Sequence, residues 1–201
     1  MKYIPLLFST PMVKAIMGGV KTQTRRIMKP QHTEIKNWHD IFLSCPYGQP
    51  GDVLWVRETF FYGGEMDENE QVSECRYWYK AESDWGQFEG VDENENLRNG
   101  PKWKPSIFMP KVACRIFLEV TDIRVERLQD ISEQDSLSEG VIGNDLGHFI
   151  DYIKPKTAWK TSAKSSYQSL WESINGPESW NHNPWVWVIG FKRVECPKGF
   201  C

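Results

Sequence analysis

The stretch that most constrains the fold is an almost unbroken apolar run over residues 185–191. Because neighbouring residues of a strand point to opposite faces, a strand built from this run is apolar on both faces. Such a strand needs cover on both sides, as strands in the interior of a sheet have. We therefore expect a β-sheet in which residues 185–191 form a central strand.

Strand and helix patterns are interleaved along the rest of the chain. Strands are predicted, from alternation or from β-branched and aromatic content, over residues 3–8, 22–28, 53–60, 76–81 and 114–127. Helices are predicted, from apolar residues at helical spacing and from capping patterns, over residues 10–17, 132–139 and 167–174. Residues 30–50 show little regular pattern and are expected to form a loop.

The charge distribution separates one segment from its surroundings. Residues 61–100 carry 11 acidic against 3 basic residues, a net charge of −8, whereas the whole chain of 201 residues has −3. We interpret this segment as an acidic, mostly loop-like insertion, and such a charge makes a poor general surface for nucleic acids. We expect one domain over residues 1–201 that contains this insertion and ends in a loose tail, 196–201.

Several classes of protein are disfavoured by what the sequence lacks. The five cysteines form no C-x-x-C pair and the four histidines show no metal-ligand spacing, so we expect no disulfide framework, no metal site and no cofactor. The apolar run over residues 3–8 is too short for a signal peptide or a membrane span. We therefore expect a cytoplasmic protein without a membrane partner.

The densest cluster of polar groups follows two glycines, in residues 18–26. The glycines should end one helix, and Lys21, Thr24, Arg25 and Arg26 accompany the start of a strand. Lys21 and Thr24 face opposite sides of a regular strand, so they can act together only if Lys21 lies in the preceding turn or a bulge intervenes. The cluster is then either a site that activates a nucleophile or holds an anion, or an exposed cationic strand edge.

Three charged residues elsewhere stand in unusual surroundings. Arg57 and Glu58 fall in the strand predicted over residues 53–60, which is largely apolar on both faces. They form either a structural ion pair or charged groups aimed into a pocket. Glu139 falls in the last turn of a predicted helix, where the helix dipole disfavours a charged carboxylate. Exceptions to local rules are typical of functional residues, although one misplaced surface glutamate is common.

The pattern G-x-K-T-x-T-x-R, from Gly19 to Arg26, resembles the signature of the ASCH family, a branch of the PUA-like superfamily. Supporting segments follow in the family's order: a turn at 51–52, a strand over 118–128, a helix over 131–140 and the closing strand over 185–191. Residues 103–109 and 183–187 make the chain similar to longer ASCH proteins encoded by phages and prophages. The resemblance implies an α+β fold, a small mixed or antiparallel β-barrel flanked by helices, with a cleft for a nucleotide or RNA.

The resemblance also implies an activity. Small bacterial ASCH enzymes are amidohydrolases that remove the acetyl group from N4-acetylcytidine, and their lysine, threonine and glutamate match Lys21, Thr24 and Glu139. Thr24 would then be the nucleophile, Lys21 would activate it and Glu139 would pass a proton to the leaving nitrogen. The residues expected to bind or orient the substrate are Arg25, Arg26, Arg57 and Glu58. This chain is about twice as long as those enzymes and its acidic insertion has no counterpart in them, so a different substrate remains open.

The alternative hypothesis is a non-catalytic module that binds RNA or a modified base. Lys21, Arg25 and Arg26 would then contact phosphates, and other ASCH relatives are reported to bind or cut RNA. Both hypotheses expect a nucleoside or single-stranded RNA as the partner. They differ in whether Lys21, Thr24 and Glu139 converge in one cleft.

Overall fold

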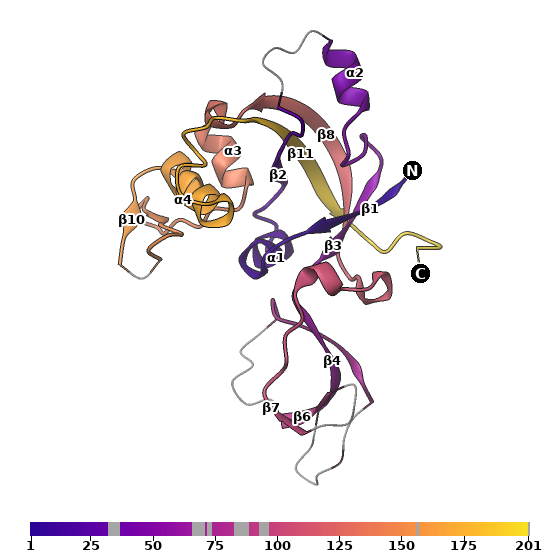
Figure 1. Ribbon diagram of the computed structural model, residues 1–201. Coiled ribbons are helices and arrows are strands. Elements are labelled where there is room, and N and C mark those ends of the chain that lie inside the picture. The colour runs from indigo at the N-terminus through magenta and orange to yellow at the C-terminus, as the bar shows by residue number, and fades with distance from the viewer. Residues whose placement is uncertain are drawn as a thin grey trace. The chain divides into compact units, whose positions relative to one another are not determined.

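The computed structural model describes residues 1–31, 37–65, 71, 74–82, 89–92, 97–155 and 157–200 (Figure 1). Within these ranges the protein has an α+β fold with a five-stranded sheet, a four-stranded sheet, a two-stranded sheet and four α-helices. The expectation of an α+β fold is confirmed. Across the described ranges, no helix is both long and apolar enough to cross a membrane.

The five-stranded sheet contains the strands that were most evident in the sequence. Its order is β1-β3-β8-β11-β2, with bounds Tyr3–Leu7, Val53–Arg57, Phe117–Arg127, Trp185–Val194 and Gln23–Ile27. Strand β11 runs antiparallel to β2, with Val188 opposite Arg25, and β8 is its other neighbour. The side chains of Val186, Val188 and Ile189 are fully buried. The apolar run therefore forms an interior strand, as its two apolar faces predicted.

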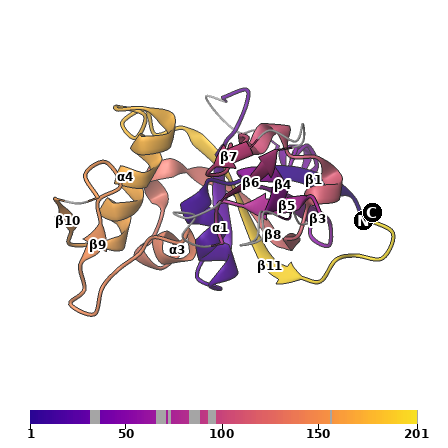
Figure 2. The same ribbon diagram turned by 90° about the horizontal axis from the view of Figure 1, so that it is seen from below.

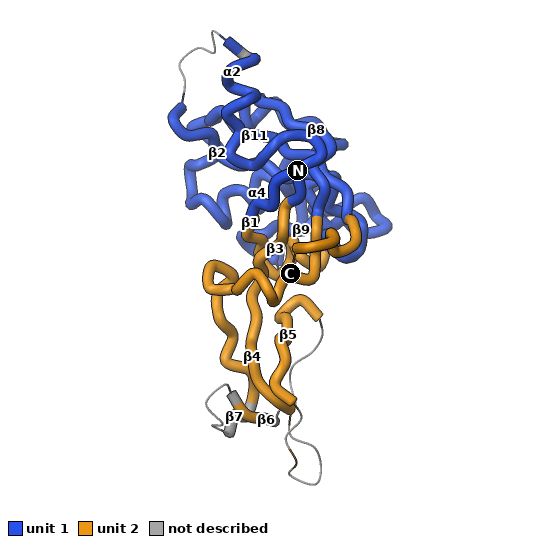
Figure 3. Tube along the Cα trace, turned by 90° about the vertical axis from the view of Figure 1, so that its right-hand side faces the viewer, with its two compact units in different colours: residues 1–4, 15–53, 118–193 blue, residues 5–14, 54–117, 194–201 orange. Residues whose placement is uncertain are grey.

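The chain divides into two compact units, each built from separate segments (Figure 3). Unit 1 comprises Met1–Ile4, Ala15–Val53 and Leu118–Arg193, and unit 2 comprises Pro5–Lys14, Leu54–Phe117 and Val194–Cys201. The single domain expected over residues 1–201 stays a prediction.

Unit 1 includes three of the α-helices and a small hairpin. Helices α3 (Glu133–Ser138) and α4 (Ala163–Asn175) pack side by side, and the short strands β9 (Phe149–Ile150) and β10 (Trp159–Lys160) pair next to α4 (Figures 1 and 2). Helix α2 (Trp38–Leu43) lies in the range expected to be a loop, and that expectation was wrong. The Asn37 side chain accepts hydrogen bonds from the N–H groups of His39 and Asp40, so a local cap was overlooked.

The described residues of the acidic insertion form a sheet more than a loop. Four strands pair in the order β5-β4-β6-β7, with bounds Arg76–Tyr79, Phe60–Glu65, Glu89–Asp92 and Leu97–Asn99. The aromatic strand expected over residues 76–81 is confirmed as β5. The single strand expected over 53–60 was wrong, because β3 ends at Arg57 and β4 begins at Phe60. The acidic stretches 66–70 and 93–96 lie outside the described residues.

Three 3₁₀ turns complete the chain, at Ser106–Phe108, Lys111–Ala113 and Leu128–Asp130. The loose tail expected over 196–201 stays a prediction, but the side chain of Phe200 within it is only 1% exposed. Its ring packs edge-on against Phe117, with centroids 4.7 Å apart, and against Trp55 at 6.1 Å. The C-terminal segment is therefore anchored in the core of unit 2.

Candidate functional site

The candidate site begins in the turn between helix α1 (Thr10–Met17) and strand β2. Gly19 has a φ of +73°, a left-handed conformation that glycine adopts without strain. The N–H groups of Val20 and Lys21 both donate to the carbonyl oxygen of Ala15, at 2.9 and 3.0 Å. Lys21 therefore lies in the turn before β2 starts at Gln23, the arrangement that the double glycine suggested.

The end of helix α3 is held against the start of β2. The backbone N–H of Thr22 donates to the carbonyl oxygen of Ser138 at 2.9 Å. The side-chain amide nitrogen of Gln23 donates to the backbone carbonyl oxygen of Asp135, also at 2.9 Å. The last carbonyl groups of a helix have no partner inside the helix. Residues of β2 supply partners here, which brings Glu139, the residue that ends α3, next to Lys21.

Lys21 and Glu139 form a buried ion pair. The Lys21 ammonium donates to Glu139 Oε2 at 2.8 Å and to the Glu139 carbonyl oxygen at 2.7 Å. The two side chains are 2% and 3% exposed. A cation at a helix C-terminus also interacts favourably with the helix dipole. Lys21 thus explains how a carboxylate is accommodated at this end of α3.

Arg25 occupies the other oxygen of the same carboxylate. Its Nη1 donates to Glu139 Oε1 at 3.0 Å, its Nε donates to Glu126 Oε1 at 3.0 Å, and its Nη2 contacts both Glu126 and Asp135. The Arg25 side chain is fully buried. Arg124 extends the network by donating to Glu126 and Asp135. Glu139 is therefore fixed between two cations, one on each oxygen.

These surroundings shift proton affinities in a direction that suits acid–base chemistry. Burial lowers the pKa of Lys21 below 10.5, and the charges of Arg26 and Arg25 act in the same direction, although Glu139 opposes them. Burial also disfavours charge on Arg25, but Glu139 and Glu126 outweigh it and raise the pKa of Arg25. A buried lysine that releases its proton more readily is a typical proton-transfer group.

Thr24 and Arg26 lie on β2 beside this network. Thr24 is buried and pairs in register with Ile189 of β11. Side chains alternate along a strand, so Thr24 and Arg26 share the face of β2 opposite to that of Gln23 and Arg25, which both reach α3. Arg26 is nevertheless close enough to Lys21 and Glu139 for their charges to interact. Burial lowers the pKa of Arg26. The structure thus unites Lys21, Arg25 and Glu139, whereas the joint action of Lys21 and Thr24 stays a prediction.

Arg57 and Glu58 belong to unit 2, not to the unit that holds Lys21 and Glu139. The Glu58 carboxylate is buried and accepts from Arg115 twice, at 2.9 and 3.1 Å. Burial raises the pKa of Glu58, and the neighbouring guanidinium opposes this. Arg57 donates to the carbonyl oxygen of Ile107 and lies 5.6 Å from the Trp55 ring. Glu58 is therefore in an ion pair, as one interpretation expected, but with Arg115 as its partner.

Several residues that contact the predicted site residues were not predicted from the sequence. They are Arg124, Glu126, Asp135 and Tyr167 in unit 1 and Arg115 in unit 2. The Arg25 guanidinium lies 5.8 Å from the Tyr167 ring on α4. One signal was available in β8. The face that is apolar at Leu118 and Val120 becomes charged at Arg124 and Glu126, which indicates a polar partner near that end of the strand.

The described residues contain no group of three or more histidine, cysteine or acidic side chains that could hold a metal ion. In comparisons with protein-family models, curated proteins and solved structures, no match to this chain was found. A function is therefore proposed from the sequence and from the geometry of the residues.

Proposed function

We propose that this protein hydrolyses the amide bond of an acylated nucleobase or nucleoside, such as N4-acetylcytidine. The observation that carries the proposal is the buried contact of 2.8 Å between the Lys21 ammonium and the Glu139 carboxylate. The resemblance to the ASCH family, with its PUA-like β-barrel and its lysine, threonine and glutamate, supplies the reaction and belongs to the proposal.

Hydrolysis of an exocyclic amide needs a nucleophile at the carbonyl carbon and a proton on the leaving nitrogen. Lys21 first passes a proton to Glu139. Because Lys21 lies in the turn before β2 and is not confined to one face of the strand, its neutral amine then accepts the proton of the Thr24 hydroxyl. The Thr24 oxygen bonds to the carbonyl carbon, and Glu139 protonates the nitrogen as the C–N bond breaks. Water hydrolyses the threonine ester, which releases the carboxylic acid and restores the hydroxyl.

The ion network supports this sequence of proton transfers in two ways. Because the pKa of Lys21 is lowered, its ammonium group loses a proton to form the neutral amine more readily than that of an exposed lysine. Arg25 occupies Glu139 Oε1 and leaves Oε2 directed at Lys21. Arg25 is thus a positioning residue, because it acts through Glu139.

The same geometry gives less support to the binding module described above. Phosphate groups are bound by cations that reach the surface. The side chains of Lys21 and Arg25 are almost completely buried, and carboxylates already occupy the Arg25 guanidinium. These two residues are therefore poorly placed for phosphate contacts.

The test is to incubate the purified protein with N4-acetylcytidine and related acylated cytosines and to separate the products by chromatography. We expect cytidine from the wild type, and a loss of at least about 100-fold for Lys21→Met, Thr24→Val and Glu139→Gln. Lys14→Met, at an exposed lysine of α1, is the matched control and should retain activity.

Thermal unfolding of each variant separates lost chemistry from lost structure. The proposal requires a variant that remains folded at the assay temperature and has lost turnover. It would be overturned by a wild type that releases no cytosine product from any acylated substrate. It would equally be overturned by folded Lys21→Met and Glu139→Gln proteins that react at the wild-type rate.

A further inference from the structure

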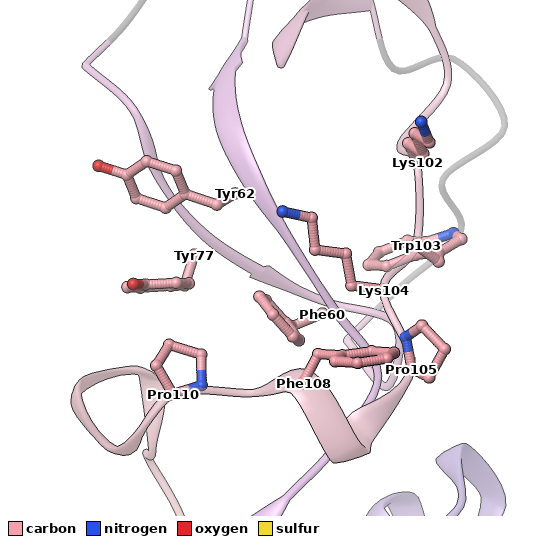
Figure 4. A pocket seen from close by; sticks show the side chains of 9 residues that line it. All are labelled: Phe60, Tyr62, Tyr77, Lys102, Trp103, Lys104, Pro105, Phe108 and Pro110. Carbon is pink, nitrogen blue, oxygen red and sulfur yellow. The ribbon is translucent and has the colours of Figure 1, made fainter. Parts of the chain in front are cut away.

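Unit 2 contains a cavity of about 600 Å³, formed by strands β4 and β5 and by the segment that follows the four-stranded sheet (Figure 4). Its volume is in the range of small-molecule sites in proteins. Five aromatic side chains dominate its lining: Phe60, Tyr62, Tyr77, Trp103 and Phe108. Residues of the segment 103–109, which carries the similarity to longer ASCH proteins, contribute to the lining, and residues of unit 1 do not.

Three of the aromatic rings, those of Tyr62, Tyr77 and Phe60, form a row in the lining of the cavity. The ring centroids of Tyr62 and Tyr77 are 4.7 Å apart, and those of Tyr77 and Phe60 are 6.1 Å apart. Phe108 keeps 68% of its surface exposed at the edge of the cavity. An apolar ring in solvent beside a row of further rings is typical of a ligand surface. Phe60 is only 3% exposed and belongs to the core, so the rings that offer stacking contacts to a flat ligand are those of Tyr62, Tyr77 and Phe108.

The charged residues in the lining are two lysines. Figure 4 shows the Lys104 ammonium in the space between Tyr62 and Trp103, with the Lys102 ammonium farther out. The backbone of Lys104 is joined to that of Phe60 by hydrogen bonds of 2.7 and 3.2 Å, so Lys104 has a defined place beside β4.

The net charge along the sequence changes from negative to positive next to the segment that contributes Lys102 and Lys104 to this cavity. Residues 101–115 carry four basic and no acidic residues, directly after the acidic segment 61–100 with its net charge of −8. Of these four, Arg115 is paired with Glu58 and Glu82, and Lys111 lies over the Phe200 ring. Lys102 and Lys104 remain, and a lining with two cations and no acidic residue favours an anionic ligand over a neutral or cationic one. Together with the rings, it favours a ligand that is both flat and anionic.

We propose that this cavity binds single-stranded nucleic acid, with bases stacked on the aromatic row and phosphates near Lys102 and Lys104. A single strand presents the faces of its bases together with its phosphates, whereas a duplex hides those faces. The proposal rests on the cavity alone and does not depend on hydrolysis at Lys21.

The experiment measures the fluorescence anisotropy of a labelled ten-nucleotide RNA strand of mixed sequence mixed with the full chain. We expect tighter binding of the single strand than of the matched duplex. Phe108→Ala should weaken binding about tenfold, because one stacked base contributes an interaction of that size. Val112→Ala, at an exposed apolar residue outside the lining, is the control and should bind as the wild type does.

The double variant Lys102→Gln/Lys104→Gln tests the charge. If two phosphates are contacted, the slope of log K against log salt concentration should become shallower by about 1.4. Lys80→Gln, at an exposed lysine of unit 2 outside the lining, should leave the slope unchanged. Binding should persist in Glu139→Gln, which separates this proposal from the proposed hydrolase activity.

Three results would overturn the proposal. The first is no binding of the single strand by the wild type, and the second is equal binding of strand and duplex. The third is displacement of the RNA by an equal charge of polyglutamate, which would indicate an acidic protein partner instead.

Discussion

The Glu139 carboxylate accepts hydrogen bonds from both Lys21 and Arg25 in a site that excludes water from all three side chains. Removing charged groups from water is unfavourable, and the loss of one partner leaves another charge buried without compensation. Arg25 is in turn held by Glu126 and Asp135. Each charge in the network therefore depends on the others, and Asp135 and Glu126 connect the buried part to the more exposed Arg124.

The residue-scale prediction concerns Asp135. Partial burial opposes its ionisation, but Arg124 and Arg25 outweigh it and lower the pKa of Asp135 below 3.8. A carboxyl group with a lower pKa in the folded chain stabilises the fold when ionised. This contribution is present above pH 3.8 and is lost as the pH falls through the folded-state pKa. We expect Asp135→Asn to lower the free energy of unfolding by about 1 kcal/mol at pH 7, with a difference that vanishes in acid.

Urea unfolding of wild type and variant, at pH 7 and at a series of lower values, measures this difference. Asp122→Asn is the matched control, since Asp122 contacts the same Arg124 at 3.5 Å but is 62% exposed. Exposed ion pairs contribute little, so we expect no measurable change in the control. A difference between Asp135→Asn and wild type that stays constant with pH would contradict the assignment.

Two secondary-structure elements meet tightly at the candidate site, the end of α3 and the turn after α1. Gly140, directly after α3, has a φ of +87°. A Cβ atom at this position would lie 2.9 Å from the Cβ of Ala15 and 3.0 Å from the Cβ of Lys21. Glycine is therefore required here by its backbone conformation and by the close approach of the turn that presents Lys21.

The element-scale prediction compares Gly140→Ala with Gly147→Ala. Gly147 also has a positive φ, +76°, but a Cβ there would meet nothing within 4 Å. We expect Gly147→Ala to destabilise by about 1 kcal/mol, from backbone strain alone. Gly140→Ala should cost about 2–4 kcal/mol, because overpacking is added. Thermal unfolding measures both, and equal losses would show that the approach of Lys21 to Gly140 is not tight.

Across the whole molecule, each unit is assembled from segments that are distant in the sequence. In unit 2 the C-terminal segment joins strands from the middle of the chain, and Phe200 packs with Phe117 and Trp55. The Lys111 ammonium lies 4.2 Å from the Phe200 ring, a cation–π contact. Phe200 therefore belongs to the core of unit 2.

The prediction at this scale is that Phe200→Ala destabilises the protein by about 3 kcal/mol or more, as is typical of a buried phenylalanine. Lys198→Ala, at an exposed residue of the same segment, should stay within about 0.5 kcal/mol of the wild type. Urea unfolding monitored by tryptophan fluorescence measures both variants. If Phe200→Ala unfolds at the same urea concentration as Lys198→Ala, the C-terminal segment is not anchored in solution.

The sequence by itself determined elements whose signals are local. The apolar run of β11 indicated an interior strand, the alternation within 114–127 indicated β8, and Gly19 and Gly140 marked the ends of α1 and α3. Local signals failed for the strands of the acidic segment, where β6 and β7 contain few apolar residues. Strands of this kind are stabilised by pairing with a neighbour more than by their own composition.

Only the tertiary structure decided which charged groups meet. Lys21 and Glu139 are 118 residues apart in the sequence, Arg25 and Glu139 are 114 apart, and Glu58 and Arg115 are 57 apart. Nothing in the local pattern around Glu139 specifies whether a lysine, an arginine or solvent will face it. That choice follows from the docking of α3 against β2 through Thr22 and Gln23. The sequence thus identified Lys21, Arg25 and Glu139 as candidates, and long-range packing made them one site.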